Sequence, residues 1–332
     1  MRTVTCRLSP RSSGTKTLIL AGLAVWTIIG ALLDVVEREA VNYVDSPWYD
    51  WMDKKRYRPL RDRNVTYAKI RDDVASPEWT PKRLVQLLEE SSSSCRKMTD
   101  LGGSYSCKDC QTCFVDGNKY ICFDPDVRPH PGDCLIYSFG VGGEVSWDTA
   151  MVHLNCSVYA FDMTSKTWDN GMLIENLHFL ALGLGPNNVD ADIQMHNETH
   201  PNLKDKKKSF FRTLDAVKDF LGHNDRVIDV LKLDIEYAEW DFFESLFRSP
   251  EKSRILQDVR QIALEIHLDD LKHESAATRV RGGQRVEQIL EELQSHGFHL
   301  VHTELNTAFQ VFADVRGEVL PLFRESLYVR RP

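Results

Sequence analysis

The sequence predicts an α/β fold in which a mostly parallel sheet carries helices on both faces. From residue 134 onward, short apolar runs alternate with segments of helical periodicity, and this alternation is typical of a parallel sheet. The first run, LIYSF, leads directly into a glycine-rich turn at 140–143. The second run ends on Asp162, which lies 22 residues after Gly140, the spacing expected between a phosphate or nucleoside loop and a ribose-binding carboxylate.

The N-terminus predicts a membrane anchor. Residues 17–33 (TLILAGLAVWTIIGALL) carry no formal charge, basic residues precede them and acidic residues follow them. The positive flank is expected to stay in the cytosol. We therefore predict a cytosolic tail at 1–16, a transmembrane signal-anchor at 17–36 and a lumenal remainder; cleavage of the same segment as a signal peptide would make the protein secreted.

The segment after the anchor indicates a secretory-pathway glycoprotein. Residues 37–79 lack sustained periodicity and are predicted to be a stalk. Asn64, Asn155 and Asn197 each begin an N-glycosylation acceptor triplet. Seven of the 8 cysteines follow the anchor, where an oxidising lumen of the ER or Golgi favours disulfides, and an odd number leaves at least one without a partner in this group.

Residues 80–133 are predicted to be a cysteine-containing extension of the main domain. A helix is expected from Thr80, with Pro81 in its first turn and an apolar stripe that includes Leu84 and Leu88. The spacing of Cys107, Cys110, Cys113 and Cys122 is compatible with zinc or an iron–sulfur cluster. The lumenal placement favours disulfides instead.

The main domain is predicted to span 134–332. The expected strands lie at 134–139, 157–161, 178–184, 227–235, 261–268, 298–302, 309–313 and 327–330. The expected helices lie at 147–154, 213–221, 239–248 and 284–296. The glycine turn and Asp162 together indicate a nucleoside-type cofactor, which could equally be nicotinamide, flavin or another nucleoside.

Further motifs carry a resemblance to a known family. The segments CLIYSFGVGGEVSWD (134–148), CSVYAFDMT (156–164), LKLDIEYAEWDFFESL (231–246) and ALEIHL (263–268) resemble the methyltransferase-like protein 24 group, related to the FkbM-type methyltransferases. The resemblance implies a class I methyltransferase (Rossmann-like) domain with a seven-stranded, mostly parallel sheet. It also implies S-adenosyl-L-methionine as the cofactor.

The resemblance also implies site residues. The cofactor-binding set is Phe139, Gly140, Gly142, Gly143, Asp162 and Met163. Asp234 and Glu236 match the position that faces the substrate and the methyl group, and His267 is a further candidate for the catalytic base. No metal is predicted, because the spacing of these three residues does not indicate one. Tyr237 departs from the family, which usually has glycine at that position.

The expected function is O-methylation of a lumenal or secreted acceptor, which the sequence does not identify as a small molecule, glycan or protein. The net charge of -8 argues against nucleic acid as a partner. A Golgi-type glycosyltransferase is an alternative, because Asp190-Ala191-Asp192 forms the D-x-D triplet that such enzymes use to bind a cation. A third alternative is an interaction protein that keeps the fold without catalysis.

Overall fold

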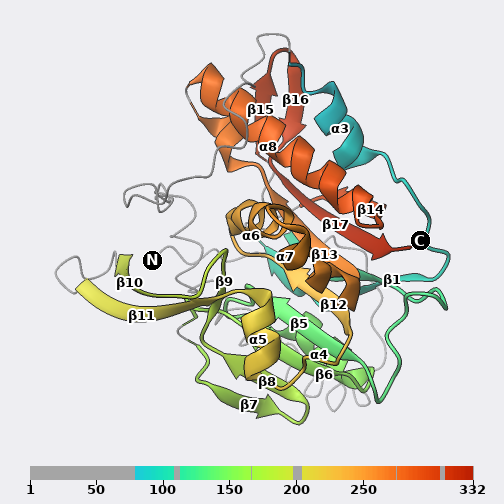
Figure 1. Cartoon of the computed structure of the whole chain (residues 1–332), viewed down its shortest axis with the longest axis vertical. Helices are drawn as coiled ribbons and strands as arrows, with labels where there is room; N and C mark the ends of the chain where they lie inside the picture. The colour runs from blue at the N-terminus through green and yellow to red at the C-terminus, as the bar shows by residue number, and fades with distance from the viewer. Residues whose placement is uncertain are drawn as a thin grey trace, which may run out of the picture. The chain divides into compact units, whose positions relative to one another are not determined.

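The computed structural model describes residues 79–107, 113–165, 167–196, 204–273, 275–306 and 311–331 (Figure 1). The predicted tail, anchor and nearly all of the stalk lie outside these residues. Within the described ranges, no helix combines the length and the apolar character needed to cross a bilayer.

The centre of the protein is a mixed sheet of eight strands in the order β14-β17-β13-β12-β5-β6-β8-β7. The strands are β5 (Leu135–Phe139), β6 (Ser157–Phe161), β7 (Gly171–Ile174), β8 (Leu177–Leu180), β12 (Ile228–Leu233), β13 (Val259–His267), β14 (Phe298–Leu305) and β17 (Phe323–Arg330). Strands β8, β6, β5, β12 and β13 are parallel to their neighbours within this set. Strand β17 is antiparallel to both of its neighbours.

The observed sheet differs from the predicted seven strands in two places. Strand β7 adds an antiparallel edge next to β8. The run at 309–313 was expected to belong to the main alternation, but β15 (Phe312–Val315) pairs with β16 (Glu318–Pro321) in a separate hairpin. A hairpin at this point leaves β17 as the strand that returns to the sheet.

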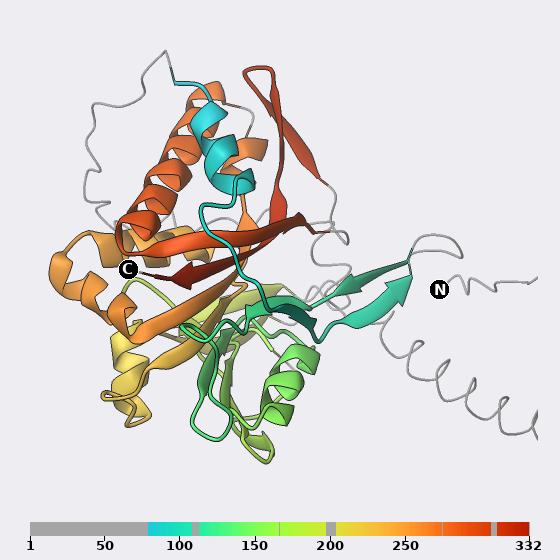
Figure 2. The ribbon, with the colours of Figure 1, turned by 90° about the vertical axis from the view of Figure 1, so that its right-hand side faces the viewer.

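Helices cover both faces of the sheet, as predicted. One face packs against α3 (Lys82–Glu89), α5 (Leu214–Phe220), α6 (Ala238–Phe247) and α8 (Ala276–Ser295). The other face packs against α4 (Ser146–His153). Figure 2 shows α3 and α8 together on one side of the sheet and α4 on the other. Short turns of helix, α7 (Pro250–Ser253), η1 (Arg254–Asp258) and η2 (Asp269–Lys272), connect the elements.

The sheet has a separate core on each face because successive side chains along a strand point to opposite faces. In β5, Leu135, Tyr137 and Phe139 enter the larger core, whereas Ile136 enters the core beneath α4. All five residues of β5 are buried because the strand lies in the middle of the sheet. Each such apolar side chain contributes about 1.5–3 kcal/mol of burial free energy.

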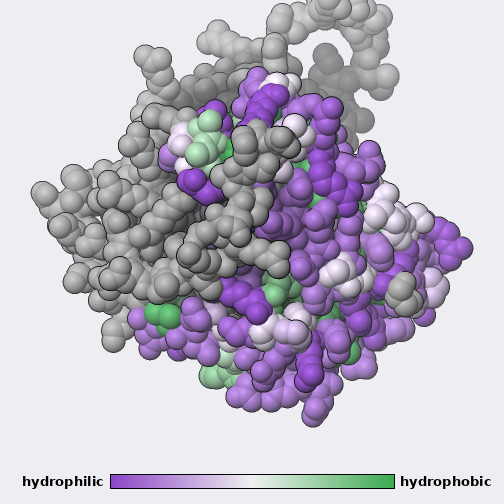
Figure 3. All heavy atoms as spheres, turned by 45° about the horizontal axis from the view of Figure 1, so that its top comes forward, coloured by the Kyte–Doolittle hydropathy of each residue, from purple (hydrophilic) through white to green (hydrophobic). Residues whose placement is uncertain are grey.

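The remaining described strands form small sheets. Strand β1 (Met98–Leu101) pairs with β4 (Lys119–Cys122), and β2 (Ser104–Cys107) pairs with β3 (Cys113–Asp116). Strands β10 (Val189–His196), β11 (Lys204–Arg212) and β9 (Gly183–Leu184) form a three-stranded sheet in the order β10-β11-β9. The view in Figure 3 shows a mostly hydrophilic described surface with scattered apolar residues.

Part of the cysteine-containing extension packs directly on the main sheet. The buried Gln261 of β13 accepts a hydrogen bond from the backbone N–H of Cys122 and donates to the carbonyl groups of Cys122 and Val127. Cys122 and Val127 share a small core with Leu327 and Val329 of β17. Strand β4 is therefore fixed against β13 and β17, and its first residue, Lys119, reaches Asp234 at the carboxyl end of β12.

Disulfides confirm the predicted use of cysteine. Cys95 is bonded to Cys122, and Cys134 to Cys156; Cys113 is also disulfide-bonded. The bond at Cys122 removes that thiolate from the metal-compatible cysteine cluster. The prediction of one cysteine without a partner remains a prediction, because the described residues do not include the whole set.

We expect loss of the Cys134–Cys156 bond to lower the free energy of unfolding by about 3 kcal/mol. The bond closes a sequence separation of 22 residues and joins the starts of β5 and β6, so its removal mainly frees the unfolded chain. The double substitution Cys134→Ala/Cys156→Ala, compared with the parent chain by urea denaturation, measures this. An unchanged denaturation midpoint would show that the bond does not contribute to stability.

Candidate active site

The glycine turn after β5 is held against the end of β12. Gly140 has φ +79, its N–H donates to the carbonyl of Phe161, and its carbonyl accepts from Lys232 Nζ at 3.0 Å. A Cβ at this position would lie 1.6 Å from the carbonyl oxygen of Asp234. Only glycine combines this backbone conformation with so close an approach.

Asp162 lies next to the same turn, as the spacing predicted. Its Oδ2 accepts a hydrogen bond from the N–H of Gly142 at 2.7 Å. Its Oδ1 accepts from the N–H and hydroxyl of Thr164 and from the N–H of Ser165. The carboxylate thus organises the loops after β5 and β6, and Oδ2 keeps acceptor capacity for a further donor such as a ribose hydroxyl.

The other predicted cofactor residues lie around this pair in different ways. Phe139 is fully buried and stacks on Phe161, with ring centroids 4.3 Å apart, so its side chain belongs to the core. Gly143 is partly exposed, and a Cβ there would meet the hydroxyl of Thr167. Met163 is partly buried, with its sulfur close to Gly183.

Asp234 follows β12 directly and is paired with two buried lysines. Its Oδ2 lies 3.4 Å from Lys119 Nζ and 3.8 Å from Lys232 Nζ. Burial opposes its ionisation, but the attraction of Lys119 and Lys232 is stronger and lowers its pKa below the ordinary value. Asp234 is therefore a permanently negative group at neutral pH.

Lys119 connects Asp234 to carboxylates on two further strands. Its Nζ lies 2.7 Å from Glu325 Oε1 of β17 and 3.5 Å from Glu265 Oε2 of β13. Glu265 also accepts a hydrogen bond from Asn306 Nδ2. Burial raises the pKa values of Glu265 and Glu325, which means that one lysine does not neutralise all these carboxylates.

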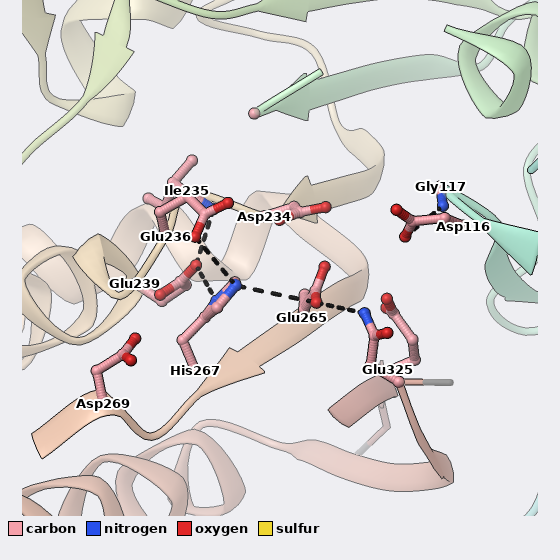
Figure 4. Close-up of polar contacts among 12 residues, drawn as sticks. Asp116, Gly117, Asp234, Ile235, Glu236, Glu239, Glu265, His267, Asp269 and Glu325 are labelled. Atoms are coloured by element: carbon pink, nitrogen blue, oxygen red, sulfur yellow. Dashed lines mark hydrogen bonds and ion pairs between the residues drawn. The ribbon is translucent and has the colours of Figure 1, made fainter. Parts of the chain in front are cut away.

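His267 ends β13 and points into the same group of side chains (Figure 4). Its Nδ1 lies 3.1 Å from Oε1 of the fully buried Glu239, which also accepts from the N–H of Ile235. Its Nε2 lies 3.8 Å from Glu236 Oε2 and 3.9 Å from Glu265 Oε1. Burial opposes protonation of His267, but Glu239 and its other carboxylate neighbours raise its pKa well above the ordinary value. The ring is therefore held as a charged or strongly polarised group.

Glu236 keeps access to solvent at the mouth of this group, with 36% of its side chain exposed. Enclosure by protein raises its pKa to about 7, an effect that Asp234 and Glu239 increase and His267 opposes. A carboxylate with a pKa near neutrality is suited to accepting a proton during catalysis.

The turn that carries Glu236 has an unusual backbone. Glu236 and Tyr237 have φ values of 56 and 76, in the left-handed region that glycine adopts most easily. This conformation suits the glycine that the resemblance implies at the second position. In this chain the Tyr237 hydroxyl donates to Asp270, so the departure from the family is accommodated by a specific contact.

The structure brings together the predicted Asp234, Glu236 and His267, and it adds residues that the sequence reasoning missed. The additions are Lys119, Lys232, Glu239, Glu265 and Glu325. Four of the five lie within or beside apolar strand segments, where a charged residue is rarely tolerated without a partner. That exception to the strand pattern is the signal that could have identified them.

The D-x-D triplet lies in a different part of the fold. Asp190 is an exposed residue of β10 whose carboxylate pairs with Arg212 of β11 at 2.9 Å. The triplet is thus part of a hairpin rather than the end of a buried parallel strand.

Comparison with known proteins identifies a family and two similar sequences. The sequence profile of a family described as "Methyltransferase domain" matches residues 47–315. This chain is also similar to the "Probable methyltransferase-like protein 24" of Homo sapiens, with 28% identity over 172 residues. The same protein of Rattus norvegicus is 28% identical over 173 residues. The alignments cover 51% of this chain and 42% or 43% of the relatives, which is less than half of their length.

Proposed function

Because this chain belongs to the methyltransferase-domain family, we propose that it uses S-adenosyl-L-methionine to O-methylate a lumenal or secreted acceptor. One observation carries the proposal. The chain runs from β5 outward to β6 and β8, then crosses back to β12 on the other side of β5, so β5 and β12 flank a topological switch point. Gly140 and Asp234 meet at the carboxyl ends of these two strands, the place where open α/β sheets bind ligands.

The residues present fit this cofactor. The glycine turn allows a ligand to approach the backbone, and Asp162 Oδ2 can accept from a ribose hydroxyl. The negative Asp234 complements a cationic sulfur. When bound, S-adenosyl-L-methionine would supply an electrophilic methyl group.

We assign the proton transfer to Glu236. The acceptor oxygen would bond to the methyl carbon as the bond from that carbon to sulfur breaks, which would release S-adenosyl-L-homocysteine. The hydroxyl proton would pass to the Glu236 carboxylate, whose pKa is matched to neutral pH. His267 keeps its own proton and stabilises the negative form of Glu236 across 3.8 Å. Asp234 remains ionised and has an electrostatic role.

A lumenal location is part of the proposal. Structural disulfides such as Cys95–Cys122 and Cys134–Cys156 are typical of proteins that fold in an oxidising compartment. Asn155, the first residue of an acceptor triplet, is exposed in the turn between α4 and β6. These features support a glycosylated type II membrane protein of the ER or Golgi, or a secreted protein if the anchor is cleaved.

The two alternative functions make different predictions. A glycosyltransferase would bind a nucleotide sugar with a divalent cation at Asp190, and the family assignment argues against it. A non-catalytic interaction protein would keep the fold but transfer no methyl group. Incubation of the purified full chain with methyl-labelled cofactor and a lumenal extract distinguishes the proposed function from both alternatives, because only a methyltransferase labels an acceptor.

In that assay we expect Glu236→Gln to lower the labelling rate by about 100-fold, because a general base is lost while positioning is retained. The parent rate should rise with pH through about 7 as Glu236 loses its proton, and this inflection should disappear in the variant. Asp269→Asn is the matched control, since Asp269 is a neighbouring, partly exposed carboxylate that pairs with Lys272. Equal rates and pH profiles for Glu236→Gln and the parent would exclude Glu236 as the base.

A further inference from the structure

Three side chains from the ends of two neighbouring strands present metal-ligand atoms to one point. Asp234 and Glu236 follow β12, and His267 ends β13. One carboxylate oxygen or ring nitrogen from each lies within 4.8 Å of the others. The parallel pairing of β12 with β13 brings these residues together although about thirty positions separate them along the chain.

His267 is oriented as a metal-binding histidine would be. The side chain is 3% exposed, and its Nδ1 is held by Glu239, the arrangement in which a buried carboxylate fixes the ring for coordination through Nε2. Nε2 has no hydrogen bond to any residue that the structure describes. It faces Glu236 Oε2 and Glu265 Oε1 at 3.8 and 3.9 Å, too far for hydrogen bonds (Figure 4).

These distances suit an ion between the side chains. Zinc bonds to histidine nitrogen and carboxylate oxygen are about 2.0–2.2 Å long, so two ligands of one ion can lie up to about 4 Å apart. The 3.8 Å between His267 Nε2 and Glu236 Oε2 falls within that span. The ligand atoms of Asp234, Glu236 and His267 all lie within 4.8 Å of one another, so small side-chain rotations would close the set around an ion.

The charges of the side chains around His267 also favour a bound cation. Ion pairs link five carboxylates, those of Asp234, Glu236, Glu239, Glu265 and Glu325, to two lysines and His267. One oxygen each of Glu239 and Glu325 is buried without a hydrogen bond. Burying several carboxylates with too few cations is costly. His267 gives up its proton when it binds an ion, so a divalent cation raises the positive charge facing the five carboxylates from three to four.

We propose that Asp234, Glu236 and His267 bind a divalent transition-metal cation, with Glu239 orienting His267. Two carboxylates and one imidazole suit Mn²⁺ or Zn²⁺ better than Ca²⁺ or Mg²⁺, which prefer oxygen ligands alone. The site does not depend on methyl transfer. If the proposed function also holds, a bound ion would activate the acceptor hydroxyl by lowering its pKa, in place of proton transfer to a metal-free Glu236 carboxylate.

Metal titration of the full chain tests this site. After treatment with EDTA and dialysis, the chain is titrated with MnCl₂ and, in parallel, with ZnCl₂ in a calorimeter without cofactor. We expect one ion to bind per chain. Glu239→Gln should weaken binding by about 10- to 100-fold, the usual effect of losing a residue that orients a ligand. Glu236→Gln, which removes a ligand with 36% side-chain exposure, should weaken it at least as much.

Asp190→Asn is the matched control, because it removes one exposed carboxylate from the D-x-D triplet. Circular dichroism confirms that each variant is folded. The site is supported if Glu236→Gln and Glu239→Gln weaken binding and Asp190→Asn does not. It is overturned if neither metal binds, if both site variants bind as tightly as the parent, or if only Asp190→Asn loses binding. Cofactor binding measured separately in EDTA tests the methyltransferase proposal without the metal.

Discussion

Gly140→Ala is expected to abolish cofactor binding and to lower the free energy of unfolding by about 3 kcal/mol or more, through left-handed strain and steric overlap together. The added Cβ would lie 1.6 Å from the carbonyl oxygen of Asp234 and 2.6 Å from its carbonyl carbon. Both are backbone atoms that follow a central strand, so they cannot move aside without disturbing β12. Urea denaturation and calorimetry with S-adenosyl-L-methionine measure the two effects.

Gly222→Ala provides the matched control for this substitution. Gly222 has a similar φ of +70, but nothing lies within 4 Å of its Cβ position. It should therefore show only the conformational cost of about 1 kcal/mol and leave cofactor binding unchanged. Similar losses of stability at both positions would show that the contact with Asp234 is unimportant.

Lys119→Met is expected to lower the free energy of unfolding by about 3–5 kcal/mol, the usual cost of leaving buried charges without their partner. The lysine is 2% exposed and lies between Asp234, Glu265 and Glu325. Without it, the pKa values of the buried glutamates rise further above those of the unfolded chain. Protonation then favours the folded state, so the loss of stability should become smaller as pH falls from 8 toward 6.

Lys218→Met is the control for this change. Lys218 is also buried, but its partner Asp258 has 44% of its side chain exposed and can be solvated when the lysine is lost. Its substitution should cost less and should show a weaker pH dependence. Adding Glu325→Gln to Lys119→Met should restore part of the stability, since one of the orphaned charges is removed. An equal loss in both lysine variants, at every pH, would contradict the proposed charge balance.

Much of the fold was predictable because its elements are local patterns. The runs at 134–139 and 157–161 became β5 and β6, and the helix expected at 147–154 is α4. The edge strand β7 was missed, since its four residues include a glycine and are mostly exposed. The run at 309–313 was placed in the main alternation, but an apolar run does not specify which strand it will pair with.

Some residues of the candidate site were likewise predictable from local sequence patterns, and others were not. Gly140 and Asp162 were predicted because a turn glycine and a strand-end carboxylate have a fixed spacing along the chain. Lys119 and Glu325, 206 positions apart, could not be paired from spacing. The spacing likewise gave no support for a metal at Asp234, Glu236 and His267, since the closeness of their ligand atoms depends on the register between β12 and β13.

The sequence by itself determined the class of fold, the glycine turn and the carboxylate beside it, because periodicity and short-range spacing act within a few tens of residues. The tertiary structure alone decided which charges meet at the strand ends, how His267 is oriented and how many cations balance the carboxylates. Those properties arise when distant strands pair and water is excluded, and electrostatic interactions then act at distances that the linear order does not contain.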